Sequence, residues 1–95
     1  MQQSTKYPVD IIAAFNPVGQ IKPLYLRIEN DAHELITMTI QKILTHKLEN
    51  YGGLRCIHYY CELIECGKEP FLCDIYYYIE THKWMIISSM IYQKI

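Results

Sequence analysis

Hydrophobic and polar residues alternate along much of the chain, and the alternation is clearest over residues 54–81. This segment, LRCIHYYCELIECGKEPFLCDIYYYIET, predicts two strands that fold back at a turn over residues 66–69. Successive side chains of a strand point to opposite faces, so each arm has one apolar face and one mixed face. We predict that the odd-numbered residues face the core: Ile57, Tyr59, Cys61, Leu63, Phe71, Cys73, Ile75, Tyr77 and Ile79.

Two further strands are expected before this hairpin, over residues 8–15 and 20–29. Residues 16–19 have Asn first, Pro second and Gly fourth, which is typical of a type I turn. Pro23 cannot donate a ladder hydrogen bond, so it indicates a sheet edge or a bulge. The expected inner residues are Val9, Ile11, Ala13, Phe15, Leu24, Leu26 and Ile28, with Ile21 and Tyr25 outside.

A last strand is expected over residues 84–88, after a reversal at residues 81–83. We expect Glu80 to pair with Trp84 across a three-residue loop, which fixes the face of every later side chain. In that register Met85 and Ile87 face the core, and Trp84 and Ile86 face outward. Residues 89–95 either continue this strand or fold over an open end of the sheet.

Residues 34–50 fit two templates. Apolar residues at helical spacing, a capping box at Asp31 and Glu34, and two following glycines favour a helix. The alternation of Ile36, Met38 and Ile40 with threonines favours a strand over residues 34–45, because helices disfavour β-branched runs. A bulge explains the break in alternation at Ile43 and Leu44. We favour the strand over the helix, and one short helix near residues 42–50, at the end of this strand, stays open.

These elements predict a mainly β fold in a single small domain. Six strands joined by short turns form an antiparallel meander, which we expect to form a closed or partly open barrel because closure removes exposed edges. The 95 residues suit one domain. Residues 1–7 carry no pattern and are expected to be a flexible N-terminus, followed by a barrel-like domain over residues 8–95.

Two segments resemble a set of short bacterial proteins of unassigned function. They are GQIKPLYLRIE at residues 19–29 and ETHKWMI at residues 80–86. In those proteins a strand, a turn with Gly, an I-K-P-L strand, a long middle section and a final hairpin ending in K-W follow in the same order. The resemblance spans most of the chain. It implies a compact β domain from a Gram-positive-type bacterium and supplies no active residues.

The cysteines Cys56, Cys61, Cys66 and Cys73 are spaced C-x4-C-x4-C-x6-C. Structural zinc sites use more closely spaced pairs, and Cys56 and Cys61 fall on opposite faces of one strand. We interpret the cysteines as core residues, with a metal site or a redox pair as alternatives and Cys66 in the turn as the reactive thiol. The chain has no phosphate-binding glycine loop, nucleophile elbow or dinucleotide fingerprint, so we expect no catalytic residue, cofactor or metal.

The histidines and carboxylates give no clear catalytic set. His33, His46, His58 and His82 are spread over turns and strands and are expected at the surface. Glu62 and Asp74 are expected near each other across the central hairpin, where paired carboxylates can serve as acid and base. An enzyme that uses this pair or Cys66 is one alternative. Such carboxylates more often pair with Lys or Arg, so we favour a non-enzymatic protein.

One surface is expected to stand out on the outer face of the last strands. It comprises His58, Tyr60, Tyr76, Tyr78, Trp84 and Ile86. Aromatic patches of this kind mark binding surfaces, so we predict an interaction or accessory module that dimerises or binds a protein partner there. Two alternatives stay open. Residues 90–95 cover this face, or Tyr76, Tyr78 and Trp84 stack on single-stranded nucleic acid or a small ligand, with charge from Lys22, Arg27 and Arg55.

Charge and hydropathy narrow the expected partners and location. The net charge is −1 and the basic residues are scattered, which argues against nucleic-acid binding through phosphates. No apolar run approaches the roughly 18 residues that a membrane helix requires. The start MQQSTKYP does not resemble a signal peptide. We therefore expect a cytoplasmic protein without membrane contact, whose cysteines are thiols.

Overall fold

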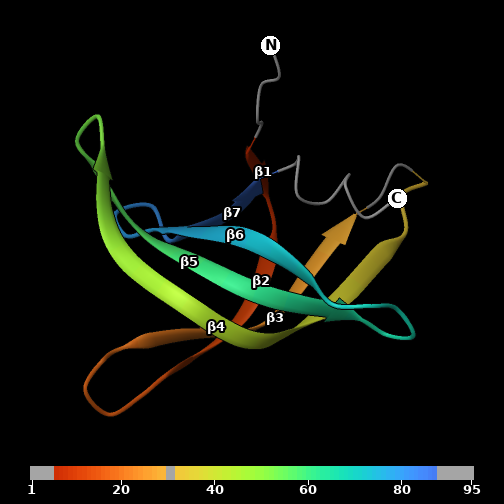
Figure 1. Ribbon diagram of the computed structural model, residues 1–95. Coiled ribbons are helices and arrows are strands. Elements are labelled where there is room, and N and C mark those ends of the chain that lie inside the picture. The colour runs from red at the N-terminus through yellow and green to blue at the C-terminus, as the bar shows by residue number, and fades with distance from the viewer. Residues whose placement is uncertain (1–5, 30–31, 88–95) are drawn as a thin grey trace.

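The structure is a computed structural model that describes residues 6–29 and 32–87. These residues form one seven-stranded sheet with the order β1-β7-β6-β5-β4-β3-β2, in which all neighbours are antiparallel (Figure 1). The described residues contain no helix. The strands are β1 (Lys6–Pro8), β2 (Asp10–Phe15), β3 (Ile21–Glu29), β4 (Leu35–Tyr51), β5 (Leu54–Glu65), β6 (Phe71–Tyr78) and β7 (Lys83–Ile87).

The sequence predicted a single strand over residues 8–15. In the structure this region is divided at Val9 into β1 and β2. β1 pairs with β7 and β2 pairs with β3, so this stretch of chain joins both edges of the sheet. At the interruption the Val9 backbone N–H donates to the Trp84 carbonyl oxygen at 3.1 Å. The sheet therefore curls into a partly open barrel (Figure 1), and the predicted six-stranded meander is confirmed. Lys6 and Tyr7, which the sequence placed in the flexible terminus, lie in β1.

The central hairpin has the predicted inner face. Ile57 pairs with Tyr77, Tyr59 with Ile75 and Cys61 with Cys73, so the odd-numbered residues of both arms share one side. The β-branched and aromatic residues of these strands fit a pleated, covered surface. With residues of β3, β4 and β7 they form one core, whose buried members are Leu26, Met38, Ile40, Tyr59, Cys61, Leu63, Cys73, Ile75, Tyr77 and Ile86.

β4 is a long strand, so the helical alternative for residues 42–50 is wrong. Its pairing with β5 shifts register twice, which leaves Gln41 and Leu44 as extra residues. These are two β-bulges, and the second is the one that the broken alternation predicts. Regular pairing continues to residue 51, beyond the predicted end at residue 45. A two-residue turn then reverses the chain at Gly52 and Gly53, whose positive φ angles of 58° and 88° suit glycine.

β3 and β4 pair over only part of their length. The ladder joins Tyr25–Glu29 of β3 to Leu35–Thr39 of β4 and extends no further among the described residues. The predicted bulge near Pro23 is confirmed, because the register between β2 and β3 shifts there and leaves Leu24 as the extra residue. This shift changes the face of the residues before it, so Ile21 packs against the core and its expected outward orientation is wrong.

The end of the β2–β3 hairpin differs from the prediction at one more position. Phe15 was expected in the core, but it is 67% exposed because it lies where the hairpin extends past the other strands (Figure 1). The turn itself is confirmed, since the Gly19 N–H donates to the Asn16 carbonyl oxygen at 2.9 Å.

The register of the last hairpin also differs from the prediction. Tyr78 pairs with Lys83 and Tyr77 with Trp84, so the loop has four residues rather than three. His82 adopts a left-handed backbone with φ 59°, and its N–H donates to the Tyr78 carbonyl oxygen at 2.9 Å. The changed register turns every later side chain to the other face. Trp84 and Ile86 therefore point into the core and Met85 lies opposite Tyr76, which overturns the predicted orientations.

The sequence also led to expectations for residues 89–95 and for membrane-spanning helices. Residues 89–95, expected to extend the last strand or fold over an open end, lie outside the described residues. Within the described part of the chain, no helix has the length and apolarity needed to cross a membrane.

We predict that the inner face carries the stability of the sheet. Replacing Ile75, which is fully buried, by alanine removes core volume and lowers the free energy of unfolding by about 2–5 kcal/mol. Leu72 on the same strand is 38% exposed, and its replacement by alanine costs less than about 1 kcal/mol. Urea denaturation measures both values. Equal losses for the two variants would contradict the assignment of the core.

Candidate functional site

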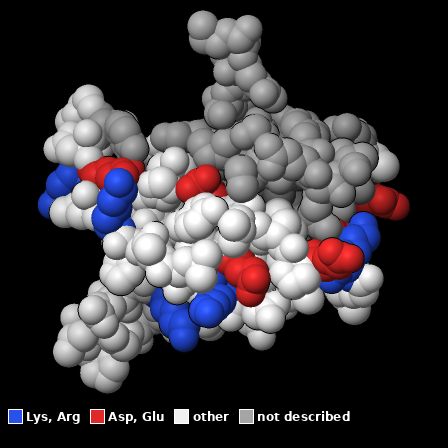
Figure 2. All heavy atoms as spheres, viewed as in Figure 1, with Lys and Arg blue, Asp and Glu red and all other residues white. Residues whose placement is uncertain are grey.

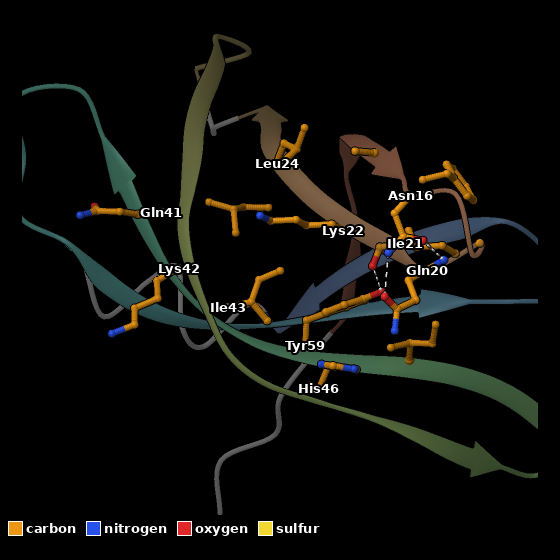
Figure 3. Close-up of a pocket in the computed structure, with 15 residues that line it drawn as sticks. Asn16, Gln20, Ile21, Lys22, Leu24, Gln41, Lys42, Ile43, His46 and Tyr59 are labelled. Atoms are coloured by element: carbon orange, nitrogen blue, oxygen red, sulfur yellow. Dashed lines mark hydrogen bonds between the residues drawn. The ribbon is translucent and has the colours of Figure 1, made fainter.

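A cavity of about 810 Å³ opens where β3 and β4 separate (Figure 3). The β2–β3 hairpin, the middle of β4 and β5 supply its walls. Binding sites for small molecules commonly occupy about 300–1,000 Å³ and often lie at the mouth of a barrel. The lining includes Phe15, Asn16, Gln20, Ile21, Lys22, Leu24, Gln41, Ile43, His46, Ile57 and Tyr59.

The cavity is largely apolar, and a tyrosine crosses it. The Tyr59 hydroxyl donates to the Ile21 carbonyl oxygen at 2.7 Å, which ties β5 to β3 at a point where no ladder joins β3 to β4. The His46 ring stacks on Tyr59 with 5.9 Å between ring centroids. Ile43 and Ile57 contribute aliphatic surface beside these rings. These walls suit the apolar part of a ligand.

Two lysines line the cavity, and they differ in orientation. Figure 3 shows Lys22 extending from β3 toward β4, whereas Lys42 points away from β3, on the far side of β4. The ion pairs between described residues include neither side chain. Lys22 therefore adds a positive charge to a largely apolar wall, where it can attract an anionic group.

A row of aromatic rings leads from the cavity across the inner face. The ring centroids of Tyr59 and Trp84 are 6.0 Å apart, and those of Trp84 and Tyr77 are 4.6 Å apart. The Tyr77 hydroxyl oxygen lies 3.0 Å from Nδ1 of His82, in the last turn. Trp84 is the single tryptophan of the chain, so its fluorescence reports on changes at the cavity.

Burial strongly affects the titratable groups of the core. Desolvation raises the pKa of Tyr59 to about 12, and the nearby Cys61 and Tyr77 add to the rise. Desolvation and the Asp74 charge also raise the pKa of Cys61 and of Cys73 to about 12. These groups are thus neutral at physiological pH, and the two thiols are poor nucleophiles.

The cysteines occupy the positions that the pattern predicts. Cys56, Cys61 and Cys73 are buried, and Cys66 is exposed in the turn. Their interpretation as core residues is confirmed, except for Cys66, which was already placed in the turn. Among the described residues, no group of three or more His, Cys, Asp or Glu side chains is arranged to hold a metal ion.

The predicted aromatic surface is divided between the two faces of the sheet. His58, Tyr60, Tyr76 and Tyr78 lie on the outer face, whereas Trp84 and Ile86 lie inside. Tyr76 is only 7% exposed and stacks on His58 with 4.3 Å between ring centroids. The six residues therefore do not form one contiguous patch. Residues 90–95, the predicted cover for this face, lie outside the described residues.

A polar cluster on the outer face links three strands. Nε2 of His58 lies 2.6 Å from Oδ1 of Asp74, and Nδ1 lies 3.3 Å from Oε2 of Glu49. Lys47 Nζ contacts the same Glu49 oxygen at 3.0 Å. Both ring nitrogens face carboxylate oxygens, which accept hydrogen bonds, so neither nitrogen is directed at a substrate. This polar cluster therefore joins β4, β5 and β6 through contacts between their side chains.

The sequence contains a signal for one contact of this polar cluster, the pair of His58 and Asp74. His58 and Asp74 both fall on the outer face, and they lie diagonally across the hairpin because His58 pairs with Tyr76. Asp74 was instead matched with Glu62, which lies opposite Leu72. Asp74 bonds to His58, so the expected carboxylate pair is replaced by a carboxylate and a histidine.

The residues expected to bind nucleic acid are not assembled into one surface. Arg27 pairs with Asp10 at 3.0 Å and Arg55 with Glu80 at 2.7 Å, and the Arg55 hydrogen bond lowers the pKa of Glu80. Trp84 lies on the opposite face from Tyr76. On the face visible in Figure 2, acidic and basic side chains of the described residues lie beside one another. A basic surface with stacking rings is therefore not formed by these residues.

No protein-family model, curated protein or solved structure matches the chain. The resemblance to short bacterial β proteins therefore stays a prediction, and functional inference depends on the geometry of the cavity and the sheet.

We predict that the protein loses stability at high pH. The pKa values of Tyr59, Cys61 and Cys73 are higher in the folded chain than the ordinary values of 10.0 for tyrosine and 9.0 for cysteine. Their contribution is fully present below pH 9 and is lost as the pH rises toward about 12, because unfolding then releases protons. Urea denaturation between pH 8 and pH 12 measures this loss. Tyr59→Phe makes the decline above pH 10 shallower, whereas Tyr25→Phe at an exposed site keeps the wild-type slope.

Labelling of the thiols tests which cysteines are buried in the folded protein. With a chromogenic disulfide reagent at neutral pH, we expect the native protein to react at Cys66 alone, because the other three thiols are buried. All four cysteines react once the chain is unfolded in denaturant. Cys66→Ser abolishes the rapid labelling of the folded protein. Rapid labelling of a second thiol in the folded protein would contradict the buried positions.

Proposed function

We propose that the chain is a non-enzymatic binding module for a small amphipathic anion, in which the ligand occupies the cavity between β3 and β4. The observation that carries this proposal is a largely apolar cavity of about 810 Å³ whose wall includes Lys22, a side chain in no ion pair between described residues. Small-molecule sites typically combine apolar walls with a few polar groups that orient the ligand. A ligand with an aliphatic body and one carboxylate meets both requirements.

Each part of the site has a separate role in this proposal. Ile43, Ile57 and the Tyr59 ring cover the aliphatic body, and each Å² of apolar surface removed from water contributes about 25 cal/mol. Lys22 orients the ligand through its anionic end. Lys42 points elsewhere, so one negative charge on the ligand suffices.

The alternative of a binding surface on the outer face has weaker support. Trp84 and Ile86 are absent from that face, and Tyr76 is buried within it. A cytoplasmic location is part of the proposal, supported by the four free thiols, because cysteines stay reduced in that compartment.

Octanoate is a suitable probe, because it has an aliphatic chain and a single carboxylate. At about 0.4 kcal/mol for each of roughly ten heavy atoms, we expect a dissociation constant near 1 mM or lower. Titration monitored by Trp84 fluorescence and by calorimetry measures it. Lys22→Met weakens binding about threefold to fivefold, as expected for the loss of a solvent-exposed ion pair.

Two controls distinguish the contribution of the Lys22 charge to binding from that of the apolar walls. Lys68→Met removes a lysine from the turn between β5 and β6, outside the cavity lining, so it leaves octanoate binding unchanged. Octanol lacks the carboxylate, so its affinity is the same for the wild type and for Lys22→Met. Absence of octanoate binding to the folded wild type, or equal losses for both lysine variants, would exclude this function.

A further inference from the structure

β4 has a free edge along its second half. It pairs with β5 as far as residue 51, but its ladder with β3 ends at Thr39. Among the described residues, no strand pairs with the other edge of β4 beyond that point. Thr45, His46, Lys47, Leu48 and Asn50 are exposed there, with Leu48 at 63%. A free strand edge presents unpaired backbone groups to which another strand can bind.

Residues 45–51 are the regular part of this edge. Both bulges of β4 lie before them, at Gln41 and Leu44, and pairing with β5 is uninterrupted from Thr45 onward. The turn at Gly52 and Gly53 leads the chain back along β5, on the other side of β4. The end of the hairpin therefore does not cover the free edge.

We propose that residues 45–51 of β4 pair antiparallel with the same residues of a second copy of the chain, centred on Leu48. Leu48 then lies opposite its own copy at the two-fold axis. Lys47 lies opposite Glu49 of the second copy, and His46 lies opposite Asn50, each twice because the pairing is symmetric. An interface of this kind uses the same surface on both chains, so assembly stops at the dimer.

The charges of the strand favour this register. Opposite charges that face each other across two strands stabilise their pairing, and like charges destabilise it. Centring the pairing on Lys47 places two lysines opposite each other, and centring it on Glu49 places two glutamates opposite each other. Centring it on His46 brings the bulge at Leu44 into the ladder. The register centred on Leu48 avoids all three problems and matches Lys47 with Glu49.

The same two residues already attract each other within one chain. Lys47 Nζ lies 3.0 Å from Oε2 of Glu49, two positions along the strand, so both side chains share the outer face. In the dimer the two chains contribute alternating charges to one cluster around the axis. Leu48 points to the inner face, since it pairs with Ile57, and its exposed side chain becomes covered by its copy.

Sedimentation velocity tests the proposal. From about 1 to 500 µM, we expect the wild-type mass to rise from 11.3 kDa toward twice that value. Lys47→Glu replaces two attractive pairs by two repulsive ones and weakens the dimer at least about tenfold. Glu49→Lys has the same effect through facing lysines. Lys42→Glu, on the same strand but outside the pairing segment, keeps the wild-type behaviour.

Mixing the two variants gives the decisive measurement. In a heterodimer of Lys47→Glu with Glu49→Lys, every charge at these positions faces an opposite one. We therefore expect two predominantly monomeric variants to form a dimer when they are combined, which shows that each is folded. A wild type that stays monomeric over the whole range overturns the proposal. So do single variants that remain dimeric, or a mixture that does not associate.

Discussion

The separation of β4 from β3 after Thr39 is the constraint on which the rest of the structure depends. β4 keeps its ladder with β5 through two bulges, at Gln41 and Leu44, and a bulge bends a strand and increases its twist. β3 in turn carries Pro23, which lacks the N–H needed for continued pairing. The cavity and the free edge of β4 both result from this divergence, and they lie on the same side of the barrel.

The inner face joins this opening to the rest of the molecule. Tyr59 bridges the gap to Ile21 and stacks near Trp84, which in turn packs on Tyr77. On the outer face, His58 connects β4, β5 and β6 through two carboxylates. Both faces of the central strands thus contain contacts between side chains of neighbouring strands, and these hold the curled sheet in register at the point where β3 no longer supports β4.

The sequence predicts most of the strands and the inner face of the central hairpin, because period-two alternation depends only on the pleat of a strand. The turn at Asn16 and the bulge near Pro23 follow from local chemistry as well. The orientation of Trp84 does not follow from such local signals. It depends on a left-handed backbone at His82, and residues 79–83 contain no glycine or asparagine that would indicate one. The cavity could not be predicted from the sequence either, because it depends on how far β3 and β4 stay paired, and their sequences are unrelated.

The pairing of β1 with β7 has a consequence for how the chain acquires its fold. Lys6 pairs with Ile87, so the contact that closes the sheet joins the two most distant strands in the sequence. During synthesis, the hairpins from β2 to β6 can form in succession, but β1 has no neighbour until the ribosome has released β7. Non-local pairings of this kind slow folding, because the intervening chain must be ordered first. The pairing of β1 with β7 can therefore begin only after β7 has been synthesised, later than the hairpins from β2 to β6.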